Sequence, residues 1–218
     1  MSLNIELARH NMIEQQVRPW DVLDSRVLEA LSAIRREDFV PPSLRNLAFT
    51  DFDLPIGHGE VMLRPVLEGR LLQAAAPNKS ESVLEVGTGS GFFTACLARL
   101  AAEVVSIEQH VDLVQAANTR LHAANVRNAR IENADALRGF EPRREFDVMV
   151  VTGAVFEFPQ DWSKWVKNGG RIVAIVGASP VQNAVLYTRN GTALEAQSLF
   201  ETDLPYLHGA EPPQRFSF

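Results

Sequence analysis

The stretch Val83-Leu84-Glu85-Val86-Gly87-Thr88-Gly89-Ser90-Gly91 decides the fold of this 218-residue chain. A short apolar run ends in three glycines at alternate positions, and a helix-forming segment follows from Phe92. Glycine has no Cβ, so the backbone N–H groups of such a turn can approach a ligand closely. A strand that leads through a glycine-rich turn into a helix holds nucleotides in doubly wound α/β folds. The stretch therefore predicts an α/β domain that binds a nucleotide-bearing ligand at this turn.

Downstream of this turn the sequence alternates between strand and helix patterns, which predicts a mostly parallel sheet covered on both faces. The Asn190-Gly191 pair between two strand-like runs is a strong hairpin signal, so the sheet is expected to end in an antiparallel pair. Asn168-Gly169-Gly170 is expected to stop the last helix. The predicted strands are 82–86, 103–108, 129–133, 146–151, 171–176, 183–189 and 193–201, and the predicted helices are 92–101, 110–124 (buried stripe Val114, Ala117, Leu121, Ala124) and 160–167.

The residues before this core are predicted to be mainly helical. One helix is expected over 3–18, a second after the N-cap Asp24, and a third from Met62 with Leu63, Leu67 and Leu71 on its apolar stripe. Pro55, Gly57 and Gly59 predict a loop over 51–61. We therefore expect one domain over 1–218, with a helical extension and loop at 1–78 and a core at 79–218.

Composition limits the functional classes. The net charge of −6 argues against a nucleic-acid partner, because phosphate neutralisation requires a basic face. No apolar run approaches the roughly 20 residues that cross a bilayer, and residues 1–11 lack a continuous apolar region, so we expect no secretory signal. The single Cys96 cannot form an internal disulfide, which is consistent with the cytoplasm. We expect no metal, and we assign His10, His110, His122 and His208 to the surface; the oligomeric state stays open.

The glycine spacing narrows the choice of ligand. Dinucleotide sites use Gly-x-Gly-x-x-Gly, whereas Gly87, Gly89 and Gly91 form Gly-x-Gly-x-Gly after an acidic Glu85. That arrangement is typical of S-adenosylmethionine-dependent methyltransferases. Glu108 ends the second strand, where a carboxylate can accept hydrogen bonds from both ribose hydroxyls, a role common to nicotinamide and adenosylmethionine sites. A P-loop is excluded because no Gly-Lys-Ser/Thr follows.

With these residues in place, the chain resembles the protein-L-isoaspartate O-methyltransferase family. The matches occur in the family's order along most of the chain. They are Val27-Leu28-Glu29-Ala30 through Arg36-Glu37-Asp38-Phe39-Val40-Pro41, Leu54-Pro55-Ile56-Gly57-His58-Gly59, Val83 to Leu97, Phe146 to Ala154, and Gly169-Gly170-Arg171-Ile172-Val173.

The resemblance implies a Rossmann-like methyltransferase fold, S-adenosyl-L-methionine as cofactor and S-adenosyl-L-homocysteine as product. It also implies, as acceptor, the carboxylate of an isoaspartyl residue in a damaged protein or peptide. Asp135 is expected at the adenine amino group and Thr152 beside the methionine end of the cofactor. The cofactor-binding positions that follow are Gly57, His58, Gly59, Glu85, Gly87, Thr88, Gly89, Gly91, Glu108, Gln109, Asp135, Ala136 and Thr152.

The chain departs from the family in the segment that follows Gly59. The family pattern Gln-Thr-Ile-Ser-x-Pro aligns with Glu60-Val61-Met62-Leu63-Arg64-Pro65, so the active-site Ser becomes Leu63 and the Thr becomes Val61. A carboxylate acceptor needs no general base, while a hydroxyl or amine acceptor makes His58 and Glu60 the candidates. The alternatives are a different substrate such as a small molecule, a protein without catalytic activity, and an NAD-dependent oxidoreductase.

Overall fold

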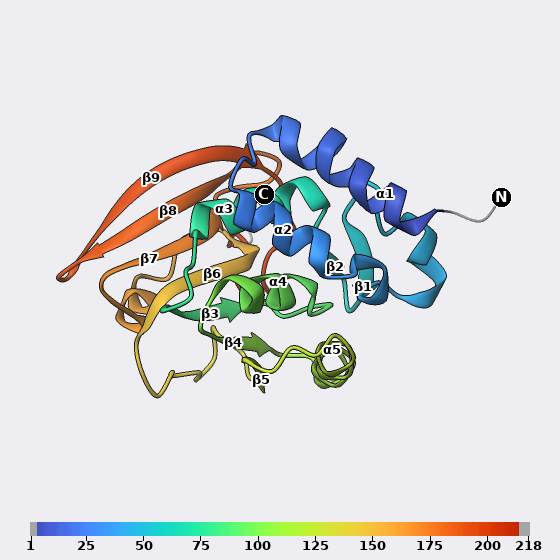
Figure 1. Ribbon diagram of the computed structural model, residues 1–218. Helices are drawn as coiled ribbons and strands as arrows, with labels where there is room; N and C mark the ends of the chain where they lie inside the picture. Colours follow the sequence, from blue (N-terminus) through green and yellow to red (C-terminus); the bar gives the residue numbers. More distant parts are fainter. Residues whose placement is uncertain (1–3, 214–218) are drawn as a thin grey trace, which may run out of the picture.

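The computed structural model describes residues 4–213, and its centre is a seven-stranded sheet in the order β5-β4-β3-β6-β7-β8-β9 (Figure 1). Strands β5, β4, β3, β6 and β7 pair in parallel, whereas β8 and β9 continue the sheet antiparallel. The predicted α/β fold with its closing hairpin is therefore confirmed. The strands are β3 (Ser82–Val86), β4 (Glu103–Glu108), β5 (Ala129–Asn133), β6 (Phe146–Val155), β7 (Val166–Val176), β8 (Gln182–Asn190) and β9 (Ala193–Thr202).

Alternate residues of the central strands enter two different apolar clusters, because successive side chains of a strand point to opposite faces. Val83 and Val148 join the cluster under the helices, while Leu84 and Met149 join the cluster on the other face. All four are fully buried, as expected for parallel strands covered on both sides.

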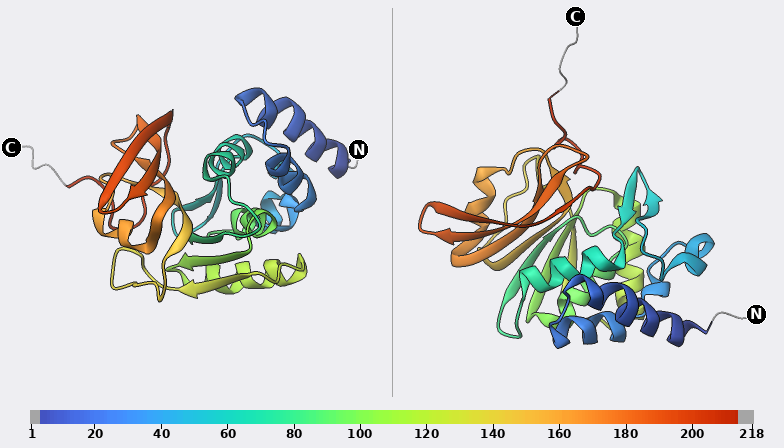
Figure 2. Two further views of the ribbon diagram at one scale, coloured as in Figure 1. Left: turned by 60° about the vertical axis from the view of Figure 1, so that its left-hand side comes forward. Right: turned by 90° about the horizontal axis from the view of Figure 1, so that it is seen from above.

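The helices cover the first face. The N-terminal helices lie beside α3 and α4 on this face in both views of Figure 2, and their apolar side chains share one cluster with the sheet. The α-helices are α1 (Ile5–Asn11), α2 (Ser25–Ala33), α3 (Pro65–Ala75), α4 (Phe92–Leu100) and α5 (Val111–Ala123). A π-helical turn spans Met12–Val17. Four 3₁₀ turns span Arg18–Trp20, Arg36–Asp38, Pro42–Leu47 and Gln160–Trp165.

The prediction of one helix over 3–18 is wrong in the type of helix and in its C-terminal end. Residue 3 lies outside the described range. Only α1 is α-helical, and the chain then continues through a π-helical turn into Arg18–Trp20. Pro19 does not stop it, because a proline in the first turn of a helix has no N–H to leave unpaired. The left-handed backbone of Asp21 ends the segment instead. The second helix begins after Asp24 as predicted, with the Asp24 carboxylate accepting from the Arg26 N–H.

The loop predicted over 51–61 contains a small antiparallel hairpin. Strands β1 (Leu54–Gly57) and β2 (Glu60–Met62) pair with each other alone, and Leu54 opposite Met62 is buried. The prediction failed because Pro55 suggests a loop, yet proline is tolerated in an edge strand. Helix α3 then starts at Pro65 rather than Met62, so Leu63 lies in the connection before the helix and not on its stripe.

The second face of the sheet carries less helix than the sequence predicts. In place of a helix over 160–167 there is the 3₁₀ turn Gln160–Trp165, which has three residues per turn and so aligns Trp162 with Trp165. Their rings stack 5.4 Å apart, and both are buried against the sheet. Asn168-Gly169-Gly170 does not stop a helix: it lies inside β7, where the pairing with β6 jumps from Val166 to Arg171.

The buried stripe of α5 also differs from the prediction. It consists of Leu113, Ala117 and Leu121, which are spaced by four residues. Val114 is half-buried and Ala124 is exposed at the C-cap.

Candidate active site

The glycine-rich turn leads from β3 into α4 at the carboxyl edge of the parallel strands. The N–H groups of Gly87 and Thr88 donate to the Ile107 carbonyl, at 2.9 and 3.1 Å, which ties the turn to β4. A Cβ on Gly87 would lie 2.5 Å from Thr152 Oγ1, and one on Gly91 would lie 3.0 Å from the Ala117 Cβ. Both glycines also have positive φ, so these two positions require glycine for conformation and for space.

Glu108 ends β4 directly beside this turn. Its Oε2 accepts from the Gly89 N–H at 3.0 Å and its Oε1 accepts from the His110 N–H at 2.9 Å, so two backbone groups fix the carboxylate. Only 6% of the residue is exposed. Each carboxylate oxygen has a second lone pair, so Glu108 can accept two further hydrogen bonds from a ligand in the adjacent pocket.

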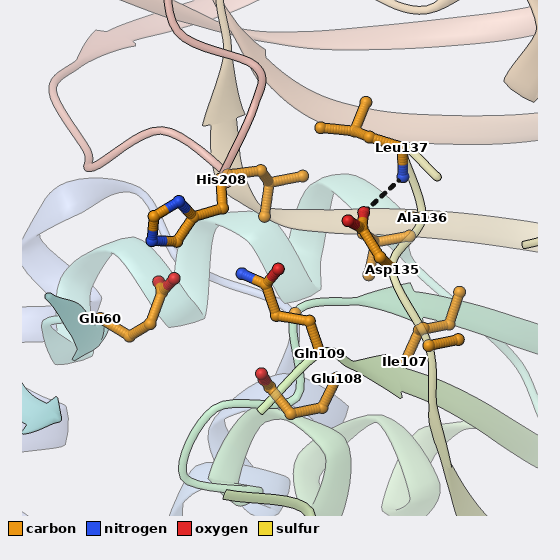
Figure 3. Close-up of a pocket in the computed structure, with 12 residues that line it drawn as sticks. Glu60, Ile107, Glu108, Gln109, Asp135, Ala136, Leu137 and His208 are labelled. Atoms are coloured by element: carbon orange, nitrogen blue, oxygen red, sulfur yellow. Dashed lines mark hydrogen bonds between the residues drawn. The ribbon is translucent and has the colours of Figure 1, made fainter. Parts of the chain in front are cut away.

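The pocket opens above the ends of β3, β4 and β5 (Figure 3). Asp135 lies at its far end from Glu60, and its Oδ1 accepts from the Leu137 N–H at 2.9 Å, which fixes the second carboxylate of the pocket. Apolar side chains form the walls between the polar groups. The lining residues are Glu60, Val86, Gly87, Ile107, Glu108, Gln109, Ala134, Asp135, Ala136, Leu137, Leu207 and His208. The predicted Gly87, Glu108, Gln109, Asp135 and Ala136 are thus brought together.

The turn of the β1–β2 hairpin, Gly57-His58-Gly59, directly precedes the pocket residue Glu60. The His58 ring stacks on His110 with centroids 4.0 Å apart, and its Nε2 lies 2.9 Å from Asp112 Oδ2. His58 is therefore held at the start of α5 and is absent from the residues that line the described pocket. Glu60, the next pocket residue along the chain, directs its carboxylate into the pocket (Figure 3).

Several predicted cofactor-binding residues support the turn from behind instead of lining the pocket. Glu85 is fully buried and accepts from Thr94 Oγ1 at 2.5 Å. The Thr88 hydroxyl lies 2.5 Å from Ser106 Oγ, and Thr152 Oγ1 donates to the Gly87 carbonyl at 2.6 Å. These side chains hold the shape of the turn, so their predicted direct contact with a cofactor stays a prediction.

Leu63, at the position of the family Ser, is a core residue. It is 6% exposed and belongs to the apolar cluster under the helices. Its carbonyl accepts from the Arg36 guanidinium at 2.6 Å. The leucine side chain packs in this cluster, which accounts for it without assigning it a ligand.

A C-terminal segment, residues 203–210, contributes to the pocket, and no prediction from the sequence included it. After β9 the chain returns across the end of β6: the Ala154 N–H donates to Pro205 and the Leu207 N–H donates to Ala154. This return brings Leu207 and His208 to the pocket; His208 is exposed, as predicted, but the prediction did not place it at the site. His110, which was also assigned to the surface, is instead partly buried between His58 and His208. No periodic pattern marks residues 203–210; the small Gly153, beneath Leu207, is the one signal that could have indicated a chain crossing there.

The charge of the pocket discriminates between possible ligands. Its lining holds three carboxylates, from Glu60, Glu108 and Asp135, and among the described residues no lysine or arginine lines it. Such a set suits the hydroxyl and amino donors of an adenosyl group and a positively charged sulfonium. It does not suit the pyrophosphate of a dinucleotide, which requires positive or N–H-rich surroundings. Within residues 4–213 no group of three or more His, Cys, Asp or Glu side chains is arranged to hold a metal ion.

Comparison with known proteins also indicates a methyltransferase that uses S-adenosylmethionine. The family model for protein-L-isoaspartate(D-aspartate) O-methyltransferase matches residues 8–204. The protein-L-isoaspartate O-methyltransferase of Methanoculleus marisnigri is 38% identical over 84% of this chain and 84% of its own length. The corresponding protein 1 of Rhodopseudomonas palustris is 37% identical over 83% of this chain and 74% of its own length.

Solved structures support the fold. A structure described as a protein-L-isoaspartate O-methyltransferase of Plasmodium falciparum, in complex with S-adenosyl-L-homocysteine, superposes with a TM-score of 0.80. It covers 94% of this chain and 99% of its own, at 17% identity. Along the described residues, no helix is long and apolar enough to pass through a membrane. The chain belongs to the protein-L-isoaspartate(D-aspartate) O-methyltransferase family and is an S-adenosylmethionine-dependent methyltransferase.

Proposed function

We propose that S-adenosylmethionine binds in the pocket between Glu60 and Asp135. The carboxylate of Glu108 accepts from the ribose hydroxyls, and Asp135 accepts from the adenine amino group. Ile107, Ala136 and Leu137 enclose the adenine ring between apolar walls. The observation that supports this most strongly is the fixed Glu108 carboxylate, which two backbone N–H groups orient toward the pocket.

We propose further that the methyl acceptor is the carboxylate of an isoaspartyl residue in a protein or peptide, as the names of the relatives indicate for those proteins. The bound cofactor supplies a methyl group on a sulfonium, and its leaving group departs neutral. A carboxylate is already ionised at pH 7, so the chain needs no general base for this acceptor. The task of the protein is therefore to position the acceptor and exclude water, which can account for much of the barrier reduction.

A second candidate is a less polar acceptor, and the sequence of the β2 segment favours it. Val61 and Leu63 leave this segment without the two hydroxyls of the family pattern. A site that hydrogen-bonds its substrate loses discrimination when those groups are missing. An acceptor with few polar groups beside the reacting atom makes no hydrogen bonds to these two hydroxyls, so their absence does not weaken its binding.

Transfer of a labelled methyl group to an isoaspartyl peptide, with the matching aspartyl peptide as control, tests the acceptor. We expect label in the isoaspartyl peptide alone, and more of it in the double variant V61T/L63S. Because Leu63 is buried, its replacement by serine is expected to cost about 2–4 kcal/mol of stability, so the fold of the variant is checked first by thermal unfolding. If folded protein that binds S-adenosylmethionine transfers no label above the control, the isoaspartyl acceptor is wrong and the second candidate replaces it.

Substitution of Glu108 tests the cofactor site independently of the acceptor. Glu108→Ala removes two charge-assisted hydrogen bonds to the ribose, each worth about 1.5–3 kcal/mol, so we expect affinity for S-adenosylmethionine to fall by more than about 100-fold. Isothermal titration calorimetry measures it directly. Unchanged affinity would refute the ribose assignment.

A further inference from the structure

Glu60 is the one pocket carboxylate that no hydrogen bond fixes within residues 4–213. Glu108 and Asp135 each accept from backbone N–H groups, as described above. Among the described residues, His110 is the one basic side chain within 4 Å of this carboxylate, with 3.9 Å between Glu60 Oε1 and His110 Nε2, which is beyond hydrogen-bond length. The Glu60 side chain is 25% exposed and directed into the pocket (Figure 3). A partly buried carboxylate without a hydrogen-bond partner in the chain is available to interact with a charged group of a ligand.

The negative charge of the Glu60 carboxylate interacts with other charged groups in the pocket. Burial raises the pKa of Glu60, and the negative charge of Glu108 raises it further, which means that the two carboxylates act on the same space. His58 and His208 oppose this when they are protonated. His110 stacks on His58, whose Nε2 is already occupied by Asp112. The negative charge of Glu60 therefore has no hydrogen-bonded counter-charge among the described side chains.

The two ligands of the proposed cofactor site differ in charge at one atom. S-adenosylmethionine carries a positive sulfonium, while S-adenosylhomocysteine has a neutral thioether there; the adenine, ribose and amino-acid groups are shared. A fixed negative charge in the pocket therefore attracts the methyl donor more strongly than the product. Glu108 and Asp135 are engaged with groups that both ligands have, which leaves Glu60 as the carboxylate free to discriminate.

We infer that Glu60 is a specificity-determining residue that favours the cationic methyl donor over its neutral product, and so promotes exchange of the product after each transfer. The inference rests on the proposed cofactor site and needs no assumption about the acceptor. It also gives this chain a reason to carry glutamate where the family pattern has the neutral, nearly isosteric glutamine.

The test is calorimetric titration at pH 8 of wild-type protein and of E60Q with three ligands. They are S-adenosylmethionine, S-adenosylhomocysteine and sinefungin, a stable analogue whose protonated amine takes the place of the sulfonium methyl. We expect the ratio of the two Kd values, product over donor, to fall about fivefold in E60Q, as for a Coulomb attraction of roughly 1 kcal/mol between partly hydrated charges. Sinefungin should behave as the donor does.

The matched control is D135N, which removes a carboxylate that faces a group common to all three ligands. It should weaken their binding alike and leave the ratio unchanged. An unchanged ratio in E60Q, or an equal change of ratio in D135N, would overturn the inference while leaving the cofactor site intact. If the wild-type protein binds none of the three ligands, the proposed cofactor site fails and this inference with it.

Discussion

Glu85 is enclosed beneath the glycine-rich turn, with none of its surface exposed. Burial raises the pKa of its carboxyl to about 8, although the Ser106 and Thr94 hydroxyls oppose the shift. Its Oε1 has no partner within the described residues. The side chain is therefore protonated over most of the neutral range, and its main effect is on the stability of the turn.

This buried carboxyl makes stability depend on pH. In the unfolded chain Glu85 ionises near its ordinary pKa of 4.5, whereas in the folded chain it holds its proton up to about 8. The stability it contributes is complete below pH 4.5 and is lost as pH rises to 8, by roughly 1.4 kcal/mol per pH unit. In the isosteric variant E85Q this contribution does not titrate.

Urea unfolding of both proteins at several pH values between 5 and 8.5 measures the effect. The free energy of unfolding of the wild type minus that of E85Q is expected to fall steadily up to pH 8 and then level off. The difference cancels the other titrating groups, since both proteins share them. A difference that stays flat over this range would mean that Glu85 is ionised in the folded protein.

At the scale of elements, the C-terminal segment depends on Gly153 in strand β6. A Cβ at this position would lie 2.6 Å from Leu207 Cδ2, so the absent side chain leaves the space that Leu207 fills on its way into the pocket. The Tyr206 hydroxyl fixes the same segment, because it donates to the Gly177 carbonyl and accepts from the Ser179 N–H. The segment thus lines one side of the pocket although it belongs to no helix or strand.

We predict that Gly153→Ala displaces Leu207 and weakens binding of S-adenosylmethionine about tenfold, since overpacking costs on the order of 1–3 kcal/mol. In the double variant G153A/L207A the clash is gone, so affinity should recover to that of L207A alone. Calorimetry on the four proteins of this cycle gives the coupling between the two positions. Additive effects would show that Gly153 does not act through Leu207.

At the scale of the whole molecule, the N-terminal helices are part of the same core as the sheet. One apolar cluster continues from Met12 and Leu31 in these helices, through Leu71 in α3, to Val148 in β6. A buried ion pair crosses this boundary as well: the Arg36 guanidinium contacts the Glu68 carboxylate of α3 and donates to the carbonyls of Ala48 and Leu63. The extension therefore fixes the segment that leads from the β1–β2 hairpin into α3.

Much of the fold follows from local sequence. The apolar run of β3, the Asn190-Gly191 turn and the glycines after Val86 each specify their structure within a few residues, so these elements were predicted with nearly the correct bounds. Strand β6 was predicted from the correct first residue, but it continues to Val155 instead of ending at Val151. The predictions failed where long-range contacts decide. The hairpin around Pro55 and the short turn at Trp162 form because their side chains are buried against distant parts of the chain.

In the candidate site, too, some features follow from local sequence and others from long-range contacts. Glu108 and Asp135 were predictable because both follow strands whose carboxyl ends must meet at one edge of a parallel sheet. Sequence by itself therefore determined the sheet, the turn and the two carboxylates that face the proposed adenosyl group. Only the tertiary structure decided that Leu63 is a core residue, that Glu85 lies behind the turn, and that His208 joins Glu60 at the pocket. These three depend on contacts between segments far apart in the chain, and neither local periodicity nor residue spacing encodes such contacts.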